Sequence, residues 1–234
     1  MLITGMNPKE LLKEASEDLK RVAAWFPKHY SIVERWIPKQ KKLPAWYCTE
    51  YKSARNNIWK CMWCIKNKRT RNGPLVEYTI INGRFGRYVV KPQARQNGFT
   101  IMVFIPHFFK RYRERLKLGD KLTPEQLIRR YLRRNTSGIN TGKDLDVELT
   151  TKEGIALGNI IFHQLILIRT FITYDMAKGN QIKRFEEGHE EMTKMGAISM
   201  YDEDVVAEMK EIGINAEDFA KKVEELKQKN KNNK

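Results

Sequence analysis

Four side chains between positions 107 and 115 could together perform acid–base chemistry on a phosphate ester. They are His107, Arg111, Glu114 and Arg115, and their spacing places them on one face of a helix. RNA cleavage without a metal ion needs a base, an acid, and cations that stabilise the pentacovalent phosphate. His107 and Glu114 suit the first two roles, and arginine suits the third because its guanidinium binds phosphate in a bidentate manner. The same pattern is also typical of a helix stabilised by Glu–Arg pairs, so both interpretations stay open.

A further candidate catalytic residue, Arg169, lies in the last of the expected strands. It interrupts an otherwise apolar row that runs from Leu165 to Phe171, and strict alternation predicts that it shares their face of the sheet. A charge at such a position needs a partner carboxylate, an edge position or a ligand. Glu148 and Glu153 are candidate structural partners, and contact with phosphate is the alternative.

This part of the chain resembles the BrnT-like and RelE-like ribonuclease-toxin families. The resemblance rests on the run His-x-x-x-Arg-x-x-Glu-Arg that begins at His107, on the short helix that follows, and on a strand group ending in Arg-Thr-Phe-Ile-Thr. It covers residues 104–181 and implies leading helices followed by a twisted antiparallel sheet, with ribonuclease activity. The positions that it implicates are His107, Arg111 and Arg115 on the helix, and Arg169, Thr170 and Thr173 on the last strand. This chain departs from those families in its greater length and in the strands that precede the helix.

The positive charge is concentrated in one section. The whole chain carries a formal net charge of +16, and residues 51–143 hold 22 Lys and Arg against four Asp and Glu, an excess of 18 positive charges. Such concentration favours a polyanionic partner, because each neutralised phosphate releases counterions. We expect nucleic acid, RNA in preference to DNA, and the alternative is a solvated surface. The side chains expected to contact the phosphate backbone are Arg111, Arg115, Arg129, Arg130, Arg133 and Arg134.

Aromatic and basic residues alternate along the strands expected before position 106. The aromatic residues are Tyr47, Tyr51, Trp59, Trp63, Tyr78, Phe85 and Tyr88, and the basic ones are Lys52, Lys60, Lys66, Arg84 and Arg87. Exposed aromatic rings on a basic sheet can stack on bases, as in single-strand binders. The alternative is that these rings form the core.

Neither the spacing of the cysteines nor any recognisable motif predicts a metal site or a cofactor. Cys61 and Cys64 are expected in a strand, where residues three apart point to opposite faces, and Cys48 is the only other thiol. The sequence has no phosphate-binding loop, dinucleotide fingerprint, zinc-protease motif or nucleophile elbow. It also has no secretory signal and no run of about 18 apolar residues, so we expect a cytoplasmic protein.

The helices and strands that the sequence predicts around these residues together indicate an α+β fold. We expect an N-terminal helical pair, broken at Pro27, then an antiparallel β-sheet interrupted by two helices, and a helical C-terminal appendage. The corresponding divisions are 1–45, 46–181 and 182–234. Strands are expected at 46–51, 58–65, 75–81, 87–91, 99–105, 145–150, 155–162 and 165–173, and helices at 107–118 and from Pro124.

The C-terminal part differs in charge from the middle of the chain. Residues 186–191 and 202–211 are rich in acids. They could fold back on the basic section, form a solvated face, or bind a separate protein. Three functions therefore stay open: a metal-independent ribonuclease, a nucleic-acid binder without catalysis, and a protein-interaction module acting through the acidic C-terminal helices.

Overall fold

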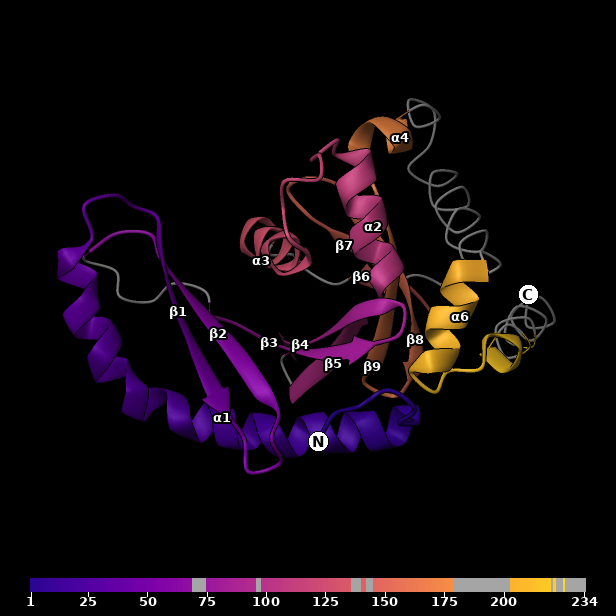
Figure 1. Cartoon of the computed structure of the whole chain (residues 1–234), viewed down its shortest axis with the longest axis horizontal. Coiled ribbons are helices and arrows are strands. Elements are labelled where there is room, and N and C mark those ends of the chain that lie inside the picture. The colour runs from indigo at the N-terminus through magenta and orange to yellow at the C-terminus, as the bar shows by residue number, and fades with distance from the viewer. Residues whose placement is uncertain are drawn as a thin grey trace, which may run out of the picture.

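The structure is a computed structural model, and it describes residues 1–68, 75–95, 98–135, 140–141, 145–178 and 203–219, with 221 and 225. These residues form an α+β fold in which helices lie on both faces of one sheet (Figure 1). The strands are β1 (Ala45–Lys52), β2 (Ile58–Ile65), β3 (Leu75–Gly83), β4 (Gly86–Arg95), β5 (Gly98–Phe104), β6 (Asn140–Thr141), β7 (Asp146–Thr150), β8 (Ile155–Phe162) and β9 (Leu165–Ile172). The helices are α1 (Pro8–Trp36), α2 (Pro106–Arg115), α3 (Pro124–Arg134), α4 (Tyr174–Lys178) and α6 (Glu203–Glu211), with a 3-10 turn η1 (Ile37–Lys39).

The described strands form one nine-stranded sheet in the order β1-β2-β3-β4-β5-β9-β8-β7-β6. All neighbours are antiparallel except β5 and β9, which are parallel. The chain leaves β5, passes through α2 and α3, and forms β6 to β8 before β9 returns alongside β5. The expected antiparallel sheet interrupted by two helices is therefore confirmed, apart from this one parallel junction.

The expected N-terminal helical pair is wrong, because α1 is a single helix of 29 residues that contains Pro27. A proline inside a helix removes a hydrogen bond and crowds the preceding turn. Aromatic packing on both sides of Pro27 compensates for this: Trp25 contacts Tyr51 before the proline, and Tyr30 packs on Trp63 after it, at 5.0 Å between ring centroids. Tertiary contacts thus hold both halves of the helix against the sheet.

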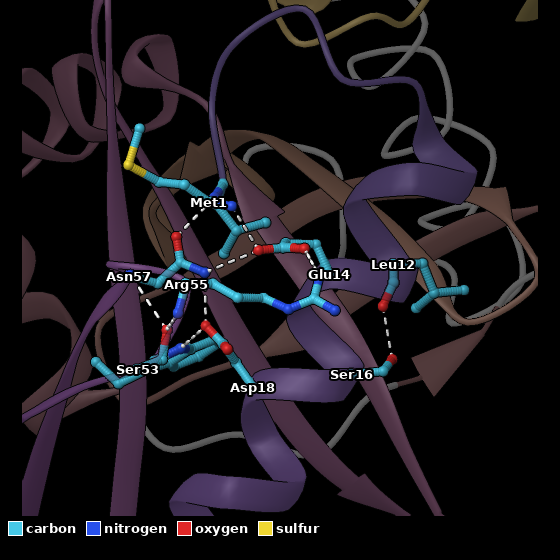
Figure 2. Close-up of polar contacts among 10 residues, drawn as sticks. Met1, Leu12, Glu14, Ser16, Asp18, Ser53, Arg55 and Asn57 are labelled. Atoms are coloured by element: carbon cyan, nitrogen blue, oxygen red, sulfur yellow. Dashed lines mark hydrogen bonds and ion pairs between the residues drawn. The ribbon is translucent and has the colours of Figure 1, made fainter.

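A buried polar cluster fixes α1 to the turn between β1 and β2 (Figure 2). Asp18 is fully buried, and its Oδ2 accepts hydrogen bonds from Asn57 Nδ2 at 2.6 Å and Trp59 Nε1 at 2.9 Å. The Glu14 carboxylate accepts from the α-amino group of Met1 at 2.7 Å and pairs with Arg55. Buried carboxylates need such partners, so these contacts set the position of α1.

Cross-strand pairing shows which face of the sheet each helix covers. The hydrogen bond from Trp59 to Asp18 places α1 on the face that carries Trp59. Pairing from β2 to β5 aligns Trp59 with the residue that precedes Phe104, so Phe104 lies on the opposite face. Phe104 packs against Phe108 of α2 and Tyr131 of α3. Helices α2 and α3 therefore cover the face opposite α1.

Helix α6 packs against α2 and contributes to the main hydrophobic core. Val205 and Met209 are fully buried in that core, which also contains Phe108. The acidic residues at 186–191 and the boundary at 181/182 lie outside the described residues, so the division of the chain at that boundary stays a prediction. No described helix has the length and apolar composition needed to cross a membrane.

Candidate nucleic-acid interface

His107 occupies a buried position at the start of α2. Its side chain is 2% exposed, and its Nε2 accepts a hydrogen bond from Arg111 Nε at 3.1 Å. Its backbone N–H donates to Glu208 Oε2 of α6 at 2.8 Å. In this position the imidazole supports the first turn of α2 and does not face solvent.

The remaining members of the predicted helical face lie closer to the surface. Arg111 Nη1 and Glu114 Oε2 form an ion pair at 3.1 Å, as the alternative interpretation of the pattern expected. Arg115 donates to the carbonyl oxygen of Phe171, and its Nη1 lies 3.4 Å from Thr170 Oγ1. Since β5 pairs with β9 only as far as Ile168, this guanidinium covers an open edge of β9.

Arg169 does not share a face with Phe171, because the strand contains a bulge between them. On β8, Leu157 pairs with Thr170 while the next residue, Gly158, pairs with Ile168, so Arg169 is the additional residue. A side chain at Gly158 would collide with the carbonyl oxygen of Leu167, which explains the glycine at this crossing. The prediction of strict alternation along this strand is therefore wrong.

The bulge places Arg169 on the face that α1 covers. Arg169 Nη2 donates to Asn159 Oδ1, and Asn159 pairs with Leu167 in the same row across the sheet as Trp59. Burial lowers the pKa of Arg169 to about 10, and the nearby Asp146 carboxylate opposes this effect. The structure thus brings His107, Arg111 and Glu114 together, but it leaves Arg169 on the opposite face of the sheet.

Glu153, expected as a partner of Arg169, instead accepts hydrogen bonds from α2 and α3. Its Oε1 lies 2.8 Å from Arg130 Nη2 and 2.5 Å from Arg134 Nε. Its Oε2 accepts from Tyr112 Oη at 2.6 Å and Asn135 Nδ2 at 2.9 Å. Burial would raise the pKa of Glu153, but these hydrogen bonds outweigh it and lower the pKa to about 2. We call these five residues the Glu153 cluster.

The other two arginines of α3 also have partners within the chain. Arg129 Nη2 pairs with Glu125 Oε1 at 3.0 Å. Arg133 Nη2 lies 2.9 Å from Cys48 Sγ, and its guanidinium lies over the ring of Trp46 at 5.6 Å. The four arginines of α3 therefore contact different parts of the chain, and they do not form one continuous basic surface.

The Cys61 and Cys64 thiols lie on opposite faces of β2. Cys61 shares the α1 face with Trp59, and Cys64 pairs with Trp46 on the other face. Burial raises the pKa of Cys61 to about 12. Within the described parts of the chain, no group of three or more His, Cys, Asp and Glu could hold a metal ion.

A groove lies where the β3–β4 hairpin meets α2 and α3, and it has a volume of about 270 Å³. We call it the hairpin groove. The hairpin contributes Phe85, Gly86 and Arg87; α2 contributes Pro106, Phe109, Lys110 and Arg113; α3 contributes Pro124, Leu127 and Ile128. Its floor is apolar and its border carries three cations. Phe85 is 45% exposed.

With the described residues, the cations of the groove form ion pairs that are exposed or long, and Arg113 Nη2 also donates a hydrogen bond to the Leu122 carbonyl oxygen at 2.6 Å. Lys110 Nζ lies 3.3 Å from Asp204 Oδ2, and the Arg113 Nη1 partner is the fully exposed Asp120 at 3.4 Å. Arg87 Nη1 lies 3.7 Å from Glu125 Oε2. Exposed pairs of this kind contribute about 0–1 kcal/mol to stability, so a phosphate group could replace the carboxylates.

The acidic helix α6 holds the hairpin beside the groove. The Glu211 carboxylate accepts hydrogen bonds from the backbone N–H groups of Arg84 and Phe85 and, at 2.6 Å, from Tyr88 Oη. A side chain at Gly83 would collide with Glu211, so the glycine permits this approach. Helix α6, which belongs to the acidic segment 202–211, therefore folds back on the basic section.

Sequence reasoning missed the groove because its three walls belong to separate elements whose approach depends on the tertiary fold. The signal that could have indicated it is the hairpin tip itself, where Phe85 lies between Arg84 and Arg87 within a glycine-rich turn. No family model, no curated protein and no solved structure matches this chain, so the resemblance to ribonuclease toxins stays a prediction.

Proposed function

We propose that this protein binds nucleic acid through the basic border of the hairpin groove. The observation that carries the proposal is the position of Arg87, Lys110 and Arg113 around one groove, where their ion pairs with described residues are exposed or long and Arg113 is also held by a hydrogen bond from its Nη2 to the Leu122 carbonyl oxygen. Phosphate contacts there would draw on the excess of positive charge in residues 51–143. The binding is a backbone contact and does not require a cofactor.

RNA is the preferred target in this proposal. Support comes from the order of elements between β5 and β9, where two helices precede an antiparallel run of strands. That order agrees with the arrangement that the resemblance to ribonuclease toxins implies. Cleavage has less support, because His107 is buried and Arg169 lies on the other face of the sheet. A separate role for the acidic C-terminal helices in binding a protein has no support from α6, since Glu208 and Glu211 bind the chain's own backbone.

The test is fluorescence anisotropy with labelled single-stranded and duplex RNA and DNA across a salt series. We expect salt-dependent binding that the triple variant Arg87→Gln, Lys110→Gln and Arg113→Gln weakens at least tenfold at low salt. The matched control removes three exposed lysines of α1, with Lys9→Gln, Lys13→Gln and Lys28→Gln. Absence of binding at low salt, or equal losses in both triple variants, would overturn the proposal. Gel analysis of the same samples with chelator tests for cleavage, which should be absent.

A further inference from the structure

We infer that the hairpin groove receives one unpaired base of a single strand while its basic border holds the neighbouring phosphates. This inference rests on the proposed function and specifies its ligand. A base that is paired and stacked within a duplex cannot present its faces to a protein groove. The groove should therefore discriminate single strands from duplexes.

The size and lining of the groove suit a single planar ring system. Its volume of about 270 Å³ lies just below the roughly 300–1,000 Å³ of pockets for drug-sized ligands. Phe109, Leu127 and Ile128 form an apolar floor, and all three are at least nine-tenths buried. No acidic side chain is among the described residues that line it. An apolar floor below a cationic border matches the two parts of a nucleotide, its base and its phosphate.

Phe85 supplies the stacking surface at the mouth of the groove. Its ring is 45% exposed, although a large apolar side chain is normally buried. The Arg84 guanidinium lies 5.8 Å from the ring centroid, which places a further cation beside the same surface. Because Glu211 accepts hydrogen bonds from the backbone of both residues, the hairpin tip is positioned before any ligand arrives. Such preorganisation reduces the entropy lost on binding.

Charge complementarity favours a nucleic-acid strand over a peptide as the occupant. The groove and the hairpin tip together present four cations: Arg84, Arg87, Lys110 and Arg113. A strand offers a negative charge at every nucleotide next to every base. An acidic peptide with an aromatic side chain is the competing occupant, and the experiment below distinguishes the two.

The test compares Phe85→Ala with wild type on a labelled ten-nucleotide single strand and on the matching duplex. We expect Phe85→Ala to weaken single-strand binding about tenfold, as for loss of one stacked aromatic residue, and to change duplex binding less than twofold. Phe85→Trp should retain the affinity, because it preserves the aromatic surface. Ile58→Ala is the matched control, since Ile58 is a similarly exposed apolar residue outside the groove. Melting curves establish that each variant is folded.

Photocrosslinking gives a second readout that does not depend on a variant. A strand containing 5-iodouridine should crosslink to wild-type protein at Phe85 or Phe109. Single-strand binding that is unaffected by Phe85→Ala, with crosslinks elsewhere, would overturn this inference and leave the proposed function standing. Equal losses for strand and duplex would also overturn it. No binding of any nucleic acid at low salt would overturn the proposed function itself, and Phe85-dependent binding of an acidic aromatic peptide in its place would assign the groove to a protein partner.

Discussion

The Glu153 cluster contains two arginines of α3 and the hairpin groove is bordered by cations of α2 and β4, and the two regions use these side chains differently. In the Glu153 cluster one carboxylate, 10% exposed, accepts hydrogen bonds from Arg130 and Arg134 at 2.8 and 2.5 Å. In the groove, Lys110 is 58% exposed and lies 3.3 Å from a carboxylate that is itself 64% exposed. The comparison shows that the burial of the acid partner decides whether an arginine or lysine stabilises the fold or remains accessible to a ligand.

The largest expected effect is the loss of stability on removing the charge of the Glu153 cluster. Glu153→Gln leaves Arg130 and Arg134 without their carboxylate, and we expect the free energy of unfolding to fall by about 3 kcal/mol, because these arginines are partly exposed and keep part of their hydration. Urea denaturation measures this change. Lys152→Gln is the control, because Lys152 is the exposed neighbour in the same turn. A loss below about 0.5 kcal/mol for Glu153→Gln would show that the cluster is no more than a surface contact.

Acid pH should weaken the same cluster. The pKa of Glu153 in the fold is about 2, below its ordinary value of 4.5. A lowered pKa means that the stabilisation is complete above pH 4.5 and is lost as the pH falls toward 2, by on the order of 3 kcal/mol. The free energy of unfolding between pH 5 and pH 2.5 should fall less steeply in Glu153→Gln than in wild type. Identical slopes would contradict the assignment.

Glu208, which supports α2 from α6, should respond to pH in the opposite direction. Burial raises its pKa to about 7, and the hydrogen bond from the His107 N–H only partly opposes this. A raised pKa favours the protonated form in the fold, so this carboxyl stabilises the protein below pH 4.5 and that contribution is lost as the pH rises through 7. We expect wild type to lose about 2–3 kcal/mol between pH 5 and pH 8 from this group. Glu208→Gln, measured by thermal unfolding at both pH values, should remove most of that difference, and an unchanged difference would assign it to another group.

The smallest expected effect on stability belongs to the groove. The triple variant Arg87→Gln, Lys110→Gln and Arg113→Gln removes exposed or long ion pairs and one hydrogen bond from Arg113 to the Leu122 carbonyl oxygen, so the free energy of unfolding should fall by no more than about 1.5 kcal/mol. Urea denaturation alongside Glu153→Gln makes the contrast direct. A loss as large as that of Glu153→Gln would mean that the groove cations are structural.

Much of the fold followed from local patterns. Alternating residues predicted every described strand except the two-residue β6, and the helix expected from Pro124 begins where α3 begins. Two errors came from contacts between distant segments: packing on the sheet carries α1 through Pro27, and the bulge at Arg169 changes which face Phe171 occupies. Neither the packing nor the bulge leaves a sign in nearby residues.

The candidate site was less accessible to sequence reasoning than the fold. The sequence identified a basic section, but it named Arg130, which is engaged by Glu153, as a phosphate contact and did not name Arg113, which borders the groove. The acids that separate these roles, Glu153 and Asp120, lie in different turns. Their distances from the arginines depend on the tertiary fold, so helical periodicity alone cannot assign the roles.

The most direct test of the central claim is the salt dependence of single-strand binding in two variants with different arginines removed. The groove triple variant, Arg87→Gln, Lys110→Gln and Arg113→Gln, should reduce the slope of log affinity against log salt by about 2. The double variant Arg129→Gln and Arg133→Gln, which leaves the Glu153 cluster intact, should keep the wild-type slope. A reduced slope in the double variant, together with an unchanged slope in the groove variant, would contradict the account and would place the interface on α3.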